Sequence, residues 1–154
     1  MKLTDNFSYE ELTNTSFKDY LQDVRNASRG YHPALYLLAK EVLEPIRKIL
    51  GEQPLRVTSG MRSRSLNTKL GGVPNSQHLY GQAADLVPKV GTPEEAFNKL
   101  VSSPEFQKIP IGQIILEKSV KIVDGKKVIV ATWIHVSLGS PYTEYDHEIL
   151  KLDK

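Results

Sequence analysis

The chain has 154 residues, of which 40% are hydrophobic and 25% charged. This is enough to bury the core of one globular domain, and we predict a single domain over residues 1–154. The net charge of +2 and the lack of a basic cluster with interleaved aromatic residues argue against a nucleic-acid partner. Cysteine is absent, which excludes disulfides and thiolate metal ligands, so a zinc ion would need His, Asp or Glu.

The start of the chain and its apolar runs bear on location. Residues 1–7 lack the apolar stretch of a signal peptide, and no apolar run reaches the length that spans a bilayer. We therefore expect a cytoplasmic protein with no membrane insertion. Nothing in its helical stripes demands a partner, and we expect a monomer.

Helix signals are concentrated in the first half. Ser8 and Glu11 have the spacing of a capping box, and Pro45 should kink the longest helix. His32 is expected in a loop. Periodicity and end signals predict helices over residues 8–12, 17–24, 33–50, 63–70, 92–102 and 104–108.

Strand signals dominate the second half. Apolar runs predict strands over residues 54–59, 83–87, 111–116, 120–123, 127–131 and 133–138. Asp124-Gly125 is the pair that a type I′ hairpin turn favours. Residues 145–152 offer a possible short helix, with His147 solvated. This segregation predicts an α+β fold.

Three residues are candidates for a metal site. His78 and Asp85 lie seven residues apart, and Asp85 interrupts an apolar strand where an unpaired charge would be costly. His135 lies in another apolar strand. Two histidines and one aspartate would leave the fourth zinc position open, as in catalytic sites. Taken singly, each is equally explained as a hydrogen-bonded core, capping or surface residue, because this spacing is not a tight signature.

Arg62 follows the predicted strand 54–59, close to the turn at Gly60. It is either an ordinary surface cation or a fixed guanidinium that binds a substrate carboxylate or a developing oxyanion.

The motifs together resemble a known family. Thr58-Ser59-Gly60-Met61-Arg62-Ser63, Leu66-Asn67, Gly71-Gly72, residues 76–85 (SQHLYGQAAD) and Trp133-Ile134-His135-Val136-Ser137 occur in the order seen in zinc D-alanyl-D-alanine carboxypeptidase-like peptidases. The resemblance extends from Phe7 to about Leu138 and is greatest to the short phage and prophage endolysin-type branch.

That resemblance implies a hedgehog/DD-peptidase-like fold, with a small antiparallel sheet and helices packed on one side. It implies that His78, Asp85 and His135 bind Zn²⁺. Arg62 would face the substrate, and Ser76 and Gln77 would line the site.

One position departs from the family pattern. Several relatives carry an acidic general base three residues before the last histidine, where this chain has Thr132. Glu117 is the expected replacement, provided that its strand pairs with residues 133–138; otherwise it is a solvated residue at a strand end. Glu52 and Asp124 are weaker alternatives.

The function implied is zinc-dependent hydrolysis of a peptide bond in bacterial cell-wall peptidoglycan. The bond would be a terminal D-Ala-D-Ala or a bond in a stem or cross-link. A phage endolysin would stay in the cytoplasm until release at lysis and then degrade the wall. The alternative is a non-catalytic module of the same fold that binds wall peptide or belongs to a phage structure.

Overall fold

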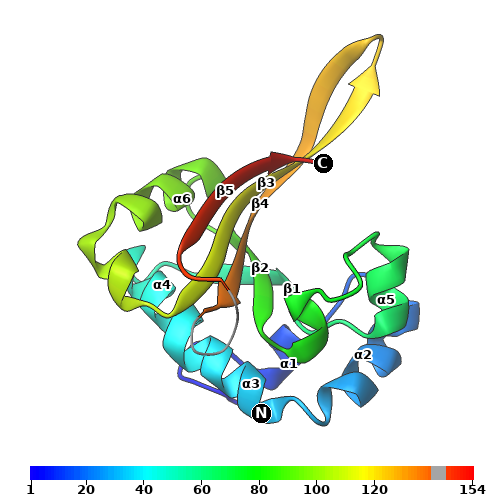
Figure 1. Cartoon of the computed structure of the whole chain (residues 1–154), viewed down its shortest axis with the longest axis vertical. Coiled ribbons are helices and arrows are strands. Elements are labelled where there is room, and N and C mark those ends of the chain that lie inside the picture. The colour runs from blue at the N-terminus through cyan, green and yellow to red at the C-terminus, as the bar shows by residue number, and fades with distance from the viewer. Residues whose placement is uncertain (140–144) are drawn as a thin grey trace.

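A computed structural model describes residues 1–139 and 145–154 (Figure 1). The helical segments are α1 (Tyr9–Leu12), η1 (Lys18–Tyr20), α2 (Leu21–Ser28), α3 (His32–Leu37), η2 (Leu38–Leu43), α4 (Glu44–Ile49), α5 (Arg64–Lys69), η3 (Gln77–Tyr80), α6 (Pro93–Ser102) and η4 (Pro104–Lys108). The strands are β1 (Leu55–Ser59), β2 (Ala83–Pro88), β3 (Ile111–Val123), β4 (Lys126–Leu138) and β5 (Glu148–Asp153). The α+β class is confirmed.

The strands form one sheet in the order β1-β2-β4-β3-β5. The pairs β1–β2, β2–β4 and β3–β4 are antiparallel, whereas β5 runs parallel to β3. The prediction of a purely antiparallel sheet is therefore wrong, because the tail adds a parallel strand at the edge next to β3.

The tail also differs from its predicted helix. Glu148–Asp153 is a strand in register with residues 113–118 of β3. Apolar spacing over residues 145–152 fits a helical stripe, but the open edge of β3 offers backbone hydrogen bonds that override this weak preference. His147, expected to be solvated, is half-buried, and its Nε2 lies 2.7 Å from the carbonyl oxygen of Ile109.

The longest predicted helix is continuous but irregular. It runs from His32 through Ile49, with a π-helical segment, η2, two residues before Pro45. Proline lacks the N–H that an α-helix needs at that point, so the wider π turn is a reasonable accommodation. His32, expected in a loop, is the first residue of α3. None of the described helices has the length and apolar content required to cross a bilayer.

The two faces of the sheet have different environments. Alternate residues of β2, β3 and β4 join the hydrophobic core with α3, η2, α4 and α6, among them Leu86, Ile114, Leu116, Ile134 and Val136. The residues between them face away from this core, and they include Asp85, His135 and Glu117. Polar groups are thus collected on one face of a sheet whose other face is anchored by burial.

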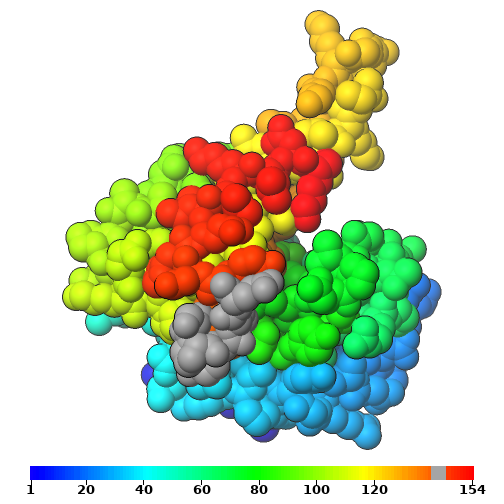
Figure 2. Space-filling view, viewed as in Figure 1, coloured from blue at the N-terminus to red at the C-terminus, as the bar shows by residue number. Residues whose placement is uncertain are grey.

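β3 and β4 continue beyond the sheet as a two-stranded ribbon. Ser119 pairs with Ala131 but Val120 pairs with Ile129, so Val130 is an extra residue in a β-bulge. We call residues 119–131 the hairpin arm; it projects from the body in Figures 1 and 2. Asp124 and Gly125 at its tip both have positive φ, 51° and 75°, as predicted for a type I′ turn.

Candidate metal centre

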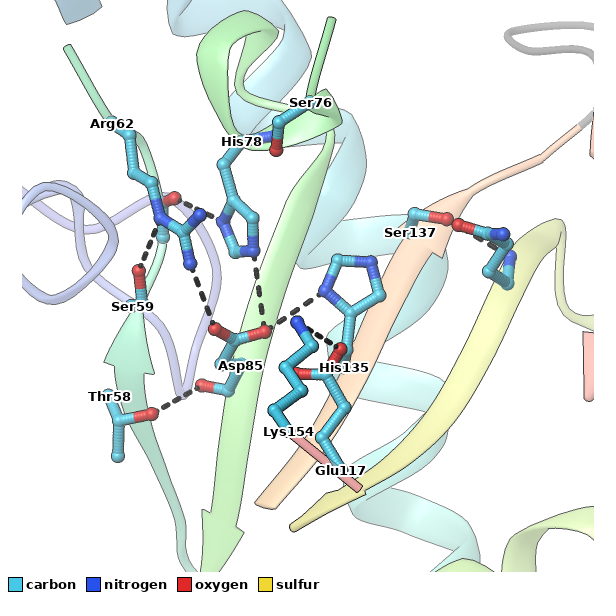
Figure 3. A network of polar contacts seen from close by, with 12 residues as sticks. Thr58, Ser59, Arg62, Ser76, His78, Asp85, Glu117, His135, Ser137 and Lys154 are labelled. Atoms are coloured by element: carbon cyan, nitrogen blue, oxygen red, sulfur yellow. Dashed lines mark hydrogen bonds and ion pairs between the residues drawn. The ribbon is translucent and has the colours of Figure 1, made fainter. Parts of the chain in front are cut away.

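Three of the predicted site residues meet on the polar face of the sheet (Figure 3). His78 comes from η3, Asp85 from β2 and His135 from the neighbouring β4, where it is the register partner of Asp85. His78 Nε2 lies 3.3 Å and His135 Nδ1 3.0 Å from Asp85 Oδ1. One ligand atom from each residue lies within 4.8 Å of the others, which suits a shared metal ion.

Neighbouring backbone fixes the orientation of His78. Its Nδ1 lies 2.7 Å from the carbonyl oxygen of Gly60, an arrangement in which Nδ1–H donates. The Nε2 lone pair is then left facing Asp85. A metal-binding histidine commonly has this second hydrogen bond, which sets both its tautomer and its ring orientation.

Gly60 is required at that position by close packing. A Cβ atom there would lie 2.3 Å from the carbonyl oxygen of Leu12, closer than real contacts permit. The same oxygen accepts a 2.8 Å hydrogen bond from Met61 N, and Arg62 N donates to the carbonyl of His78 at 2.9 Å. The turn after β1 is therefore fitted tightly between α1 and η3.

Asp85 is a buried carboxylate with compensating partners. Burial alone would raise its pKa, but the neighbouring His78 and His135 side chains hold the pKa far below its usual range. Arg62 Nη2 adds an ion pair at 3.3 Å to the other oxygen, Oδ2. Asp85 is thus ionised at neutral pH, as a metal ligand requires.

His78 is suited to bind a metal as a neutral imidazole. Burial lowers its pKa, and this effect outweighs the opposing attraction of Asp85. A neutral ring at pH 7 keeps the Nε2 lone pair available. Two imidazoles, one carboxylate and a fixed His78 tautomer form a donor set that fits Zn²⁺.

Arg62 is held by the protein itself. Besides Asp85, its Nε lies 3.3 Å from Ser59 Oγ and its Nη1 lies 3.3 Å from Asn67 Oδ1. These contacts make Arg62 a positioning residue for Asp85. Its predicted contact with substrate stays a prediction.

Ser76 and Gln77 also lie beside the cluster. The Ser76 hydroxyl accepts from the backbone N of His78 at 3.3 Å and caps η3. Gln77 Nε2 donates to the carbonyl of Leu138 at 3.2 Å, whereas its buried Oε1 has no hydrogen-bond partner among the described residues.

Glu117 lies on the same face, one strand away from His135. β3 and β4 pair as the sequence analysis required: Ile115 is opposite His135 and Glu117 is opposite Trp133. Glu117 is 5% exposed. The rival acidic residues, Glu52 and Asp124, are exposed, and Asp124 is at the tip of the hairpin arm.

Glu117 has a partner that the sequence did not predict. Lys154 Nζ lies 3.0 Å from Glu117 Oε1. The backbone of Lys154 extends the pairing of β5, since its N donates to the carbonyl of Lys118 at 2.6 Å and its O accepts from Val120 at 2.8 Å. No sequence motif signals this contact, because it depends on the parallel pairing of the tail.

Comparison with known proteins identifies the family. A sequence model of the Peptidase M15 family matches residues 5–123. The chain belongs to the Peptidase M15 family. The match includes Arg62, His78, Asp85 and Glu117, whereas His135 lies beyond it and is brought to the cluster by the pairing of β4 with β2.

A curated relative is similar over part of its length. The zinc D-Ala-D-Ala carboxypeptidase of Streptomyces albus G is 38% identical over 81 residues, which are 53% of this chain and 31% of that protein. The chain thus matches about a third of its relative. The predicted family is confirmed, and the predicted class, a zinc metallopeptidase, agrees with both comparisons and with the His-Asp-His cluster.

Proposed function

We propose that this protein is a zinc-dependent peptidase that hydrolyses a peptide bond in bacterial cell-wall peptidoglycan. One observation carries the proposal: a His-Asp-His cluster lies on the same sheet face as a buried carboxylate one strand away. Family membership and the carboxypeptidase relative support the reaction class and the kind of substrate.

Three side chains would hold the ion. His78, Asp85 and His135 supply two nitrogens and one oxygen and leave a position for water, which is the ligand pattern of catalytic zinc sites. Zinc bound there supplies Lewis-acid activation of water and of the scissile carbonyl, and it brings the pKa of the water to roughly 7.

Glu117 is assigned as the general base and acid. It takes a proton from the attacking water and later donates one to the leaving amine. Its position diagonal to His135 across the β3–β4 pair puts the carboxylate within side-chain reach of the cluster. Lys154 Nζ lies 3.0 Å from Glu117 Oε1 and helps to hold the carboxylate in place.

Arg62 keeps Asp85 charged and oriented through its Oδ2 contact. Any oxyanion stabilisation by Arg62 would require its guanidinium to serve the substrate as well as Asp85. Ser76 and Gln77 line the substrate side in this proposal, because both lie in or directly before η3, the segment that carries His78.

The proposal includes two finer alternatives. The bond cut is either a terminal D-Ala-D-Ala bond, as in a carboxypeptidase, or a stem or cross-link bond, as in an endolysin of phage origin. Mass spectrometry of the products separates them, because only the first releases free D-alanine and leaves the cross-links intact.

The experiment that tests the function is digestion of purified peptidoglycan by the zinc-loaded protein, with newly released amines as the readout. We expect release that depends on added zinc and that chelation abolishes. A folded protein with about one bound zinc per chain and no amine release would contradict the peptidase and favour a wall-binding module.

A further inference from the structure

The hairpin arm has an unusual surface for a segment outside the core. Residues 121–130 are all exposed, and five of them are large β-branched residues: Ile122, Val123, Val128, Ile129 and Val130. Ile122 is 66% exposed and Ile129 55% exposed. Lys121, Lys126 and Lys127 lie in the same segment, and none of these lysines forms an ion pair with a described residue.

The fold itself does not require this arm. The core cluster contains residues of β3 and β4 only up to Leu116 and from Ile134 onward. Apolar ribbons with unpaired edges are an aggregation hazard that proteins ordinarily shorten or cover. A ribbon that combines exposed apolar residues with unpaired cations is instead typical of a binding surface.

Register divides the arm into two faces. Lys121 is opposite Val128 and Val123 is opposite Lys126, whereas Ile122 is opposite Lys127. Because side chains alternate along a strand, Lys121 and Val123 continue the face of Glu117. We call Lys121, Val123, Lys126 and Val128 the site-side face, and Val120, Ile122, Lys127 and Ile129 the outer face.

Composition alone does not distinguish these faces, since each mixes lysine with β-branched residues. Their positions distinguish them, because the site-side face continues directly from Glu117 and Trp133 on the polar face of the sheet. Lys154 lies at that junction, bound to Glu117 and to the backbone of Val120. Figure 2 shows a hollow between the red end of β5 and the green segment that contains η3, and the arm rises above it.

We propose that the site-side face of the arm binds the peptidoglycan polymer, with Lys121 and Lys126 pairing with carboxylates of its stem peptides. This inference rests on the proposed function, which supplies the polymer as substrate. Charge complementarity supports it: among the exposed residues 121–130 there are three lysines and one acid, Asp124, and that acid is in the turn. A polymer held along the arm would present its neighbouring peptides to the cluster, which raises their local concentration there.

Two double variants of the full chain test the proposal. Lys121→Ala with Lys126→Ala removes the site-side cations. Lys118→Ala with Lys127→Ala, the outer variant, removes Lys127 of the outer face and Lys118, which precedes the arm on the same side of β3. Binding is measured by co-sedimentation with insoluble peptidoglycan sacculi in the Glu117→Gln background, so that digestion does not alter the polymer. Hydrolysis is measured with Glu117 intact, both on sacculi and on a short soluble peptide ending in D-Ala-D-Ala.

We expect the site-side variant to lose about tenfold in affinity for sacculi and a similar factor in hydrolysis of sacculi at low concentration. Its hydrolysis of the short peptide should be unchanged, because that peptide reaches the cluster without the arm. The outer variant should match the parent within about twofold in all three assays.

Several outcomes would overturn the inference. Equal losses of sacculi binding in the two variants, or no loss in either, would contradict the assignment of the site-side face as the docking surface. If the site-side variant kept its binding to sacculi but lost the parent's binding to phosphatidylglycerol vesicles, the arm would bind lipid instead. If the parent formed a concentration-dependent dimer that the variant lost, the arm would bind a second copy of the chain. Failure of the proposed function appears differently: the parent would hydrolyse neither substrate, whatever the variants bind.

Discussion

The inner and outer halves of the β3–β4 hairpin are made of the same kind of strand but are stabilised differently. In the inner half, Ile114, Leu116, Ile134 and Val136 are buried against helices, and that burial fixes His135 and Glu117 on the opposite face. In the outer half, residues 121–130 are all exposed, and the described contacts that hold this part of the ribbon are cross-strand pairs and the turn. The polar residues of the inner half are therefore held by a buried opposite face, whereas the arm has no such support.

The largest effect is expected from loss of a metal ligand in the inner region. His78→Ala should reduce zinc content from about one ion per chain to near zero and abolish peptide hydrolysis, because the remaining two ligands do not form a catalytic site. Elemental analysis of both proteins is the measurement. His32→Ala is the matched control, since His32 stacks on Tyr9 and is not part of the cluster. Full zinc content in the His78 variant would remove His78 from the site.

The next effect concerns chemistry without loss of metal. Glu117→Gln should lower the hydrolysis rate by about 10²–10⁴-fold with zinc content unchanged, because the amide cannot accept the proton. Steady-state kinetics and elemental analysis together give the answer. Glu148→Gln, an exposed carboxylate of β5 that contacts Gln113, is the control. A Glu117 variant with near-normal rates would require a different base.

Two isoleucine-to-alanine substitutions compare the packing of the inner half with that of the arm. Ile134→Ala in the inner half should lower the free energy of unfolding by about 2–5 kcal/mol, because the side chain is 1% exposed and leaves a cavity. Ile129→Ala in the arm should cost no more than about 0.5 kcal/mol. Urea denaturation measures both. Similar losses in the two variants would show that the arm packs against something after all.

A smaller effect on activity is expected where the metal ligands are kept but the orientation of His78 is disturbed. Gly60→Ala should weaken zinc binding by about 10–100-fold, because the added Cβ displaces the carbonyl that orients His78. Gly125→Ala places a Cβ in open space at the tip of the arm and should leave zinc affinity unchanged, although its positive φ strains the turn. Competition with a chromophoric chelator measures both affinities. Unchanged binding in the Gly60 variant would mean that His78 is oriented by other contacts.

The sequence predicts the residues of the metal cluster better than it predicts the strand formed by the tail. Asp85 and His135 stand out because each interrupts an apolar run, and His78 because it lies seven residues before Asp85. The pairing of the Glu117 strand with residues 133–138, stated beforehand as a condition, is present. The tail could not be predicted, because Ile149 and Leu152 fit a helical stripe as well as a strand. The tail forms a strand because it pairs with the open edge of β3, which is a tertiary effect. The contact of Lys154 with Glu117 depends on this pairing and could not be predicted either.

The pairing of Asp85 with His135 also has a consequence for how the protein folds. These partners are separated by 50 residues, whereas the β3–β4 hairpin between residues 111 and 138 is closed by local contacts around one turn. Local contacts form sooner than distant ones, so we expect the hairpin to form early and β2 to dock on it late. The site would then be assembled in the last steps, and metal capture during refolding would report the slow closure of the sheet.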